Sequence, residues 1–116
     1  MEKFKVKKGA DISHLNIEMR EALPIMASIY AKYGYSMTIT SGNDGKHMAG
    51  SKHYVNNAVD LRIWGIVEDG FLQIIANEMQ EMLDLHKSGY QVVIEDDHYH
   101  IEWDSTNWYP QRRFKL

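Results

Sequence analysis

Residues 90–103, with the sequence YQVVIEDDHYHIEW, limit the possible architecture strongly. The β-branched run 90–95 predicts a strand, the acidic pair at 96–97 predicts a tight turn, and 98–103 predicts the returning strand of a hairpin. Successive side chains of a strand point to opposite faces. One face of the returning strand is therefore apolar, with Tyr99, Ile101 and Trp103. The other face carries His98, His100 and Glu102, so we expect one face for packing and one for chemistry.

Two helices and two further strands are predicted before this hairpin. Apolar residues recur with the spacing of one helix face over 15–33, where Pro24 predicts a kink or a fresh start, and again over 71–87. Strands are expected at 36–40 and at 58–64, where Asp60 falls on the polar side. Residues 1–13 are expected to form a loose arm or a short edge strand. The whole chain of 116 residues predicts one α+β domain, with a small antiparallel sheet and two packing helices.

Composition excludes several classes of function. The net charge of -3 disfavours nucleic acid as a partner, and the chain has no cysteine, so any zinc site must use histidine and carboxylate ligands. The N-terminus lacks the apolar core of a signal peptide, and no run of about 18 apolar residues predicts a membrane segment. We expect a monomer that is synthesised in the cytoplasm. To reach a substrate outside the membrane, the protein would need an export route other than a signal peptide.

The stretch SKHYVNNAVD ends at Asp60 and contains the first candidate ligands. His53 and Asp60 are seven positions apart, which on a helix would separate them axially by about 10.5 Å, too far to share one ion. A turn is favoured because the asparagines at 56–57 tolerate a left-handed backbone. It would bring the imidazole and the carboxylate together, and His98 and His100 would supply the missing ligands. The competing interpretation of Asp60 is an ion pair with Arg62 on a solvated face.

The pattern SxHxxxxxxD, followed some forty residues later by DxHxH, resembles the zinc peptidoglycan peptidases. These are the D-Ala-D-Ala carboxypeptidases and dipeptidases and the L-alanyl-D-glutamate peptidases of phage endolysins. The resemblance covers about residues 15–103 and implies a hedgehog-like single domain. It also implies a zinc ion held by His53, Asp60 and His100. Asp97, three residues before the last ligand, corresponds to the general base, although Glu95 with His98 has the same spacing.

The residue types suit that chemistry. Three nitrogen and oxygen ligands leave the fourth zinc position open to water, whose pKa falls to about 7. Asp97 at the hairpin turn can accept the proton of that water and deliver it to the leaving amine. By resemblance, His98 steadies the developing oxyanion. Glu102 is a candidate hydrogen-bond partner for a ligating histidine on the same strand face.

Two positions depart from the pattern of the family. Asn56 stands where many members have glycine, and asparagine also visits positive φ. The region 43–46, NDGK, stands where many members have an arginine that binds the substrate carboxylate. Lys46, His47, Lys52 or Arg62 would have to supply that charge, but lysine binds a carboxylate less directionally than arginine does. The expected substrate-binding residues are therefore Ser51, Lys46 and His47.

The expected reaction is endopeptidase cleavage of peptidoglycan stem peptide, in preference to release of a terminal D-Ala. Such an enzyme would reach the wall after lysis by another protein or as part of a phage particle. Three alternatives remain open. The first is a closed structural zinc site in a binding module, with His53, Asp60, His98 and His100 all ligating. The second is a sugar-binding or signalling domain of related fold without hydrolysis. The third is a cupin-like site, which the scarcity of short strands disfavours.

Overall fold

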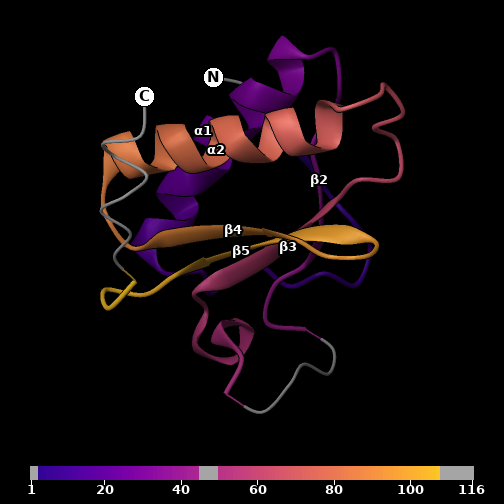
Figure 1. Cartoon of the computed structure of the whole chain (residues 1–116). Coiled ribbons are helices and arrows are strands. Elements are labelled where there is room, and N and C mark those ends of the chain that lie inside the picture. Colours follow the sequence, from indigo (N-terminus) through magenta and orange to yellow (C-terminus); the bar gives the residue numbers. More distant parts are fainter. Residues whose placement is uncertain (1–2, 45–49, 108–116) are drawn as a thin grey trace.

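The computed structural model describes residues 3–44 and 50–107, with only the backbone at His53 and Tyr54. The elements within these ranges are β1 (Lys5–Val6), α1 (Ile17–Lys32), β2 (Thr38–Ser41), the 3-10 helix η1 (Lys52–Val55), β3 (Ala58–Arg62), α2 (Phe71–His86), β4 (Tyr90–Ile94) and β5 (His98–Trp103). The strands form a five-stranded sheet in the order β1-β2-β3-β5-β4 (Figure 1). All pairings are antiparallel except β1 with β2, which is parallel. The predicted α+β class is confirmed.

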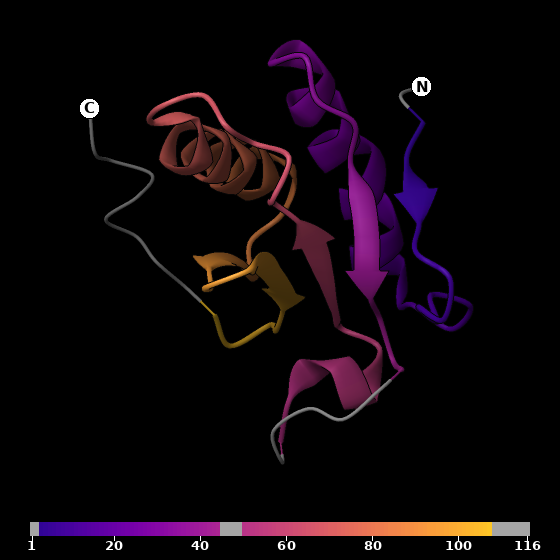
Figure 2. The same cartoon turned by 90° about the vertical axis from the view of Figure 1, so that its right-hand side faces the viewer.

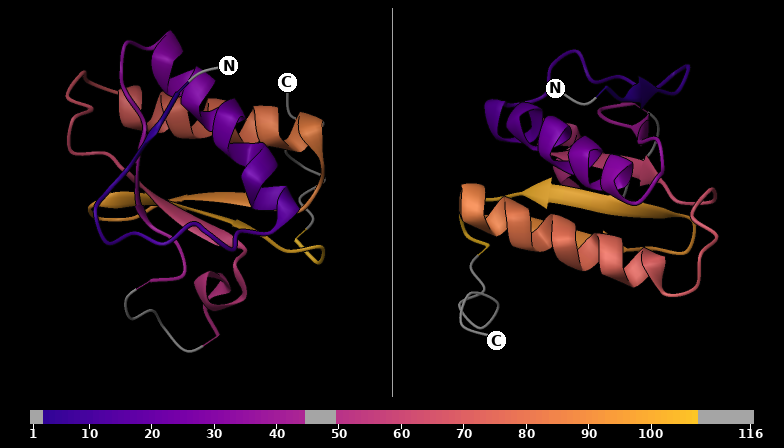
Figure 3. Two further views of the ribbon diagram at one scale, coloured as in Figure 1. Left: turned by 180° about the vertical axis from the view of Figure 1, so that it is seen from behind. Right: turned by 90° about the horizontal axis from the view of Figure 1, so that it is seen from above.

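The two α-helices pack on one face of the sheet. Figure 3 shows α1 and α2 on the same side of the strands, where α1 contacts α2 and α2 contacts β4. The short helix η1 lies on the opposite side, between the end of β2 and the start of β3 (Figure 2), and it packs against β3 and β5. Since neither α-helix covers that second face, its polar side chains are left to η1 and the solvent.

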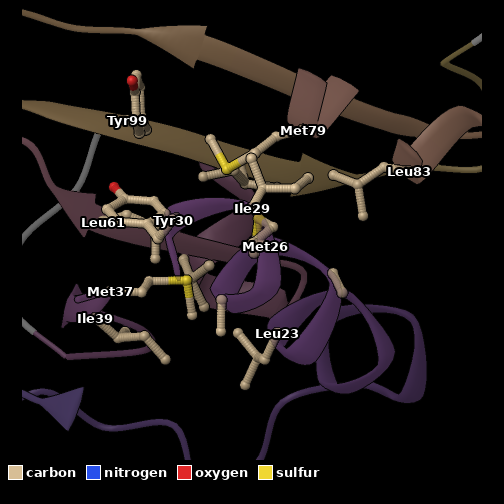
Figure 4. Close-up of a cluster of buried hydrophobic side chains, with 14 of the residues drawn as sticks. Leu23, Met26, Ile29, Tyr30, Met37, Ile39, Leu61, Met79, Leu83 and Tyr99 are labelled. Atoms are coloured by element: carbon tan, nitrogen blue, oxygen red, sulfur yellow. The ribbon is translucent and has the colours of Figure 1, made fainter. Parts of the chain in front are cut away.

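The core between the helices and the sheet is filled by methionine, aliphatic and tyrosine side chains (Figure 4). Met26 of α1 and Met79 of α2 are fully buried, where their unbranched side chains fill the core. Each such side chain contributes about 1.5–3 kcal/mol by leaving water. Three fully buried tyrosines donate their hydroxyls to backbone carbonyls: Tyr30 to Arg62 at 2.9 Å, Tyr90 to Glu18 at 2.5 Å and Tyr99 to Leu72 at 2.6 Å. Burial raises the pKa of all three phenols.

The helix predictions hold with small shifts at the ends. α1 begins at Ile17, two residues after the first apolar position of the pattern. It continues through Pro24 as one helix, so the fresh start allowed there does not occur. Gly34, at φ 86°, follows its last turn. α2 ends at His86, next to the predicted boundary.

The hairpin of β4 and β5 follows the prediction closely. The backbone N–H of Glu95 donates to the carbonyl of His98 at 2.9 Å and closes the turn at Asp96 and Asp97. Tyr99 and Ile101 are fully buried beneath the helices. The alternate side chains, those of His98, His100 and Glu102, are only partly buried and lie on the other face. The separation into a packing face and a polar face is therefore confirmed.

The N-terminal segment is a short edge strand, one of its two predicted forms. Lys7 donates its backbone N–H to the carbonyl of Ile39 at 2.8 Å and so extends the contact of β1 with β2. At the other end of β2, Gly42 lies against the backbone of Asp11, where a β-carbon would sit 2.1 Å from the carbonyl oxygen. Only glycine fits there. Neither α-helix of the described residues has the length and apolar character needed to cross a membrane.

Candidate metal centre

The polar face of β3 and β5 brings together residues that are forty positions apart. In the antiparallel register, Asp60 lies opposite His100 and Arg62 lies opposite His98. All four side chains share one face because each strand advances by two residues between them. Pairing of β3 with β5 thus joins the acidic residue of the first motif to the histidines of the second.

Asp60 is the centre of this group. Its side chain is largely buried, and one carboxylate oxygen, Oδ1, lies 3.2 Å from Nδ1 of His100 and 3.5 Å from Nε2 of His98. The ion pair with Arg62 that was the competing interpretation is replaced by these contacts to imidazoles. Arg62 instead makes a cation–π contact with Trp64, with its guanidinium carbon 5.0 Å from the ring centroid.

Each imidazole has a second carboxylate on its other nitrogen. Nε2 of His100 lies 3.0 Å from Oε1 of Glu102, so the predicted contact between these residues is present. Nδ1 of His98 lies 2.5 Å from Oδ1 of Asp97. The result is a continuous row of contacts from Asp97 through His98, Asp60 and His100 to Glu102, in which the contact between His98 and Asp60 is an ion pair and the others are hydrogen bonds.

This arrangement favours a positive charge on His100. Burial lowers its pKa, but the hydrogen bonds to Asp60 and Glu102 outweigh burial, and the pKa is raised above its ordinary value. The physical reason is that a neutral imidazole has one N–H, whereas His100 faces a carboxylate at both nitrogens. A cation at this position satisfies both carboxylates.

The donor atoms also suit a zinc ion. Around tetrahedral zinc with bonds of about 2.0–2.1 Å, two donor atoms stand roughly 3.3 Å apart. The distances of 3.2 Å and 3.5 Å from Asp60 Oδ1 to the two histidines are close to that value. The described side chains contain no group of three or more His, Cys, Asp or Glu placed to hold one metal ion. A three-ligand site therefore needs His53, of which only the backbone is described.

The backbone of the first motif adopts the predicted turn. Asn56 has φ 63°, as expected of an asparagine in a left-handed position, and the N–H of Asn57 donates to the carbonyl of Lys52 at 2.9 Å. Two distant contacts hold η1 to this face. Nδ2 of Asn16 lies 3.2 Å from the carbonyl of Val55 and 2.6 Å from Oδ1 of Asn57. Nζ of Lys52 lies 2.6 Å from Oδ2 of Asp104.

A pocket of about 590 Å³ opens beside Asp60 and His98. Asp97, whose side chain is 88 % exposed, lies on its wall at the hairpin turn. Lys7 and Trp64 also line it. No pattern in the sequence pointed to Lys7, which lies in a short basic segment and reaches the pocket through the pairing of β1 with β2.

The structure describes only some of the remaining residues that were predicted to bind substrate. Lys46 and His47 lie outside the described residues. Ser51 immediately precedes η1 and is half-buried. Lys52, a candidate source of positive charge for the substrate, is instead ion-paired with Asp104, and this pair holds the pKa of the Lys52 ammonium above its ordinary value. Four residues were candidates for the positive charge that binds the substrate carboxylate. Of the two that the structure describes, Lys52 and Arg62, only Arg62 lines the pocket.

Comparison with models of known protein families, with curated proteins and with solved structures found no match for this chain.

Proposed function

We propose that this protein is a zinc-dependent peptidase that cleaves the stem peptides of bacterial peptidoglycan. The observation that carries the proposal is the carboxylate of Asp60, which is shared by His98 and His100 at the edge of a pocket lined by Asp97. The proposed ligands are His53, Asp60 and His100. The motif resemblance supplies the substrate class, and the geometry on β3 and β5 supports the chemistry.

The residues around the proposed ligands, Asp97, His98 and Glu102, each have a role in catalysis or in holding a ligand. Bound zinc would act as a Lewis acid and lower the pKa of a water molecule to about 7. Asp97, exposed at the turn and on the pocket wall, accepts a proton and passes it to the leaving amine. The hydrogen bond that Nδ1 of His98 donates to the carboxylate of Asp97 orients the ring of His98, which donates through Nε2 to the developing negative charge on the substrate. Glu102 fixes the ring of His100 through Nε2.

Metal content measured by mass spectrometry tests the ligands. We expect one zinc ion per chain in the wild type and loss of stoichiometric zinc in His53→Ala and His100→Ala. His86→Ala is the matched control, because His86 lies at the end of α2 beside Glu21, on the helical side of the sheet. Full zinc content in both ligand variants would show that the assignment is wrong.

Digestion of purified cell walls, with identification of the new amino termini, tests the reaction. Asp97→Asn should retain zinc and fold and lose roughly a hundredfold or more in turnover, the usual contribution of a positioned general base. Glu95→Gln is the control on the same hairpin and should retain activity. If instead Glu95→Gln is inactive and Asp97→Asn is active, Glu95 is the base.

A closed structural zinc site is the second candidate. It is favoured by one specific observation, the approach of His98 Nε2 to within 3.5 Å of the same oxygen of Asp60. With His98 as a fourth protein ligand, no position would remain for water. X-ray absorption at the zinc edge that shows four protein ligands, together with no release of amino termini from any wall preparation, would favour this candidate over the peptidase.

A further inference from the structure

A second pocket, of about 190 Å³, lies next to the pocket at the candidate metal centre. Arg62, Trp64 and Ile66 line both pockets, so the two cavities are neighbours that share this wall. The other lining residues come from α1, from the start of β2 and from the loop after β3, and they are Tyr30, Tyr35, Ser36, Thr38 and Gly65. Sites for drug-sized molecules have volumes of about 300–1,000 Å³, so this smaller pocket suits a single ring.

Trp64 lies in an ordered turn at the junction of the two pockets. The backbone N–H of Ile66 donates to the carbonyl of Ile63 at 2.8 Å. Both isoleucine side chains are buried, whereas Trp64 between them is 74 % exposed. The guanidinium carbon of Arg62 lies 5.0 Å from the centroid of the Trp64 ring. The turn and this contact fix the indole at the rim of both pockets, with most of its surface open to a ligand.

The second pocket combines this aromatic ring with hydroxyl groups. Thr38 is only 8 % exposed and lies in the wall of the pocket together with Ser36. Within residues 3–44 and 50–107, neither hydroxyl has a hydrogen-bond partner. A hydroxyl both donates and accepts hydrogen bonds, and buried polar groups are normally satisfied by protein, water or ligand. These two therefore suit a ligand that carries hydroxyl or amide groups of its own.

A pyranose sugar matches both features of this pocket. One face of its ring carries mainly C–H groups, which pack on the negative face of an indole, while its hydroxyl and acetamido groups exchange hydrogen bonds with protein. A purely apolar partner would leave the hydroxyls of Ser36 and Thr38 without hydrogen bonds. The exposed acids Glu68 and Asp69 in the same loop also disfavour an anionic membrane surface.

We propose that Trp64 and the second pocket bind one N-acetylated sugar of the glycan strand, while the stem peptide attached to that strand enters the pocket at the candidate metal centre. This inference rests on the proposed peptidase function for the identity of the polymer, because peptidoglycan joins peptides to N-acetylated sugars. It adds that a stem peptide still attached to its sugar is preferred over the free peptide. Binding of the sugar can be measured without hydrolysis.

The binding test titrates chitotriose, a trimer of N-acetylglucosamine, into the full chain and measures the affinity by calorimetry. We expect saturable binding to the wild type and at least about tenfold weaker binding to Trp64→Ala, a difference of ~1.4 kcal/mol, because the ring that packs on the sugar is lost. Trp64→Phe keeps an aromatic ring and should retain part of the affinity. Thr38→Val removes one hydroxyl and should weaken binding by about two- to tenfold, the usual effect of one hydrogen bond.

Val67→Ala is the matched control, because Val67 is 80 % exposed in the same loop and lines neither pocket. It should bind chitotriose as the wild type does. Circular dichroism verifies that each variant is folded. The inference would be overturned by any of three results: no binding to the wild type, equal affinity in Trp64→Ala and the wild type, or equal losses in Trp64→Ala and Val67→Ala.

Hydrolysis separates this inference from the proposed function. The two substrates are one stem peptide with and without its attached disaccharide. We expect the wild type to have a kcat/KM about tenfold higher for the peptide with the disaccharide, and Trp64→Ala to bring the ratio of the two values close to one. Binding of chitotriose through Trp64 without cleavage of either substrate would refute the peptidase and retain the sugar site. Cleavage of both substrates with equal kcat/KM by the wild type would retain the peptidase and refute the sugar site.

Discussion

Glu102 acts on the candidate metal centre through one atom of one ring. Its carboxylate lies 3.0 Å from Nε2 of His100, and Nδ2 of Asn107 lies 3.4 Å from its second oxygen. Partners of this kind hold a ligating imidazole in one tautomer and one orientation, and their loss typically weakens metal binding about 10–100-fold. Glu102 is thus a positioning residue in the proposed zinc site.

We expect Glu102→Ala to weaken zinc binding by about 10–100-fold, because His100 would lose the partner that orients its ring. Glu102→Gln should have a smaller effect, since the amide oxygen can still accept a hydrogen bond from Nε2. Competition with a chromophoric chelator measures the dissociation constants. Glu95→Ala, an exposed acid on the same hairpin, is the control, and equal affinity in Glu102→Ala and the wild type would contradict the role assigned to Glu102.

At the scale of elements, η1 depends on a contact made by the residue before α1. The side chain of Asn16 makes no capping hydrogen bond to α1. Its amide nitrogen lies near the carbonyl of Val55 and Oδ1 of Asn57, while its backbone N–H donates to the carbonyl of Asn56 at 3.1 Å. The start of one helix thereby fixes the turn that delivers His53 and leads into β3.

We expect Asn16→Ala to lower the free energy of unfolding by about 1–2 kcal/mol, the usual net value of one or two hydrogen bonds, and to weaken zinc binding as well. Asn16→Asp distinguishes the two possible roles of this residue. Aspartate is a good helix N-cap but cannot donate to the carbonyl of Val55, so it should be destabilising if docking of η1 matters. Urea denaturation measures both variants against Asn77→Ala, an exposed asparagine of α2. Wild-type stability in Asn16→Asp would contradict the docking role.

The sequence was sufficient where a short-range pattern determines structure. Alternation in β5 separated His98 and His100 from Tyr99, and the intrinsic tolerance of Asn56 for positive φ predicted the turn. It was insufficient where the outcome depends on pairing between distant segments. β1 has only two residues, too few to show the apolar and polar alternation of a strand. The position of Lys7 in the pocket wall could therefore not be predicted from the neighbouring sequence. The contacts of Asn16 span about forty residues and are likewise invisible to local patterns.

At the scale of the whole molecule, Asp44 connects the N-terminal segment to the end of β2. Its carboxylate accepts hydrogen bonds of 2.7 Å from the backbone N–H groups of Asp11 and Gly42. Burial raises the pKa of Asp44, but these hydrogen bonds outweigh burial, so its pKa in the folded protein lies below the ordinary value of 3.8. The carboxylate thus helps to hold the segment that carries β1 against the sheet.

A lowered pKa in the folded state means that Asp44 contributes stability above pH 3.8, its ordinary pKa, and that this contribution is lost as the pH falls through the folded value. We expect Asp44→Asn to be less stable than the wild type by roughly 1 kcal/mol at pH 7, and the difference should disappear as the pH falls through the folded pKa of Asp44. Urea titrations across this range measure the difference. Asp69→Asn is a control in a surface loop, and a difference that does not change with pH would contradict the role of the Asp44 charge.

The alternation of His98, Tyr99, His100 and Ile101 along β5 has a consequence for how this protein can change. Substitution at any one of these positions alters either packing or chemistry, but an insertion or deletion of one codon just before His98 would exchange the two faces. Both imidazoles would then enter the layer beneath the helices, and a tyrosine would point toward η1. We therefore expect β5 to tolerate some substitutions but no insertion or deletion of a single residue.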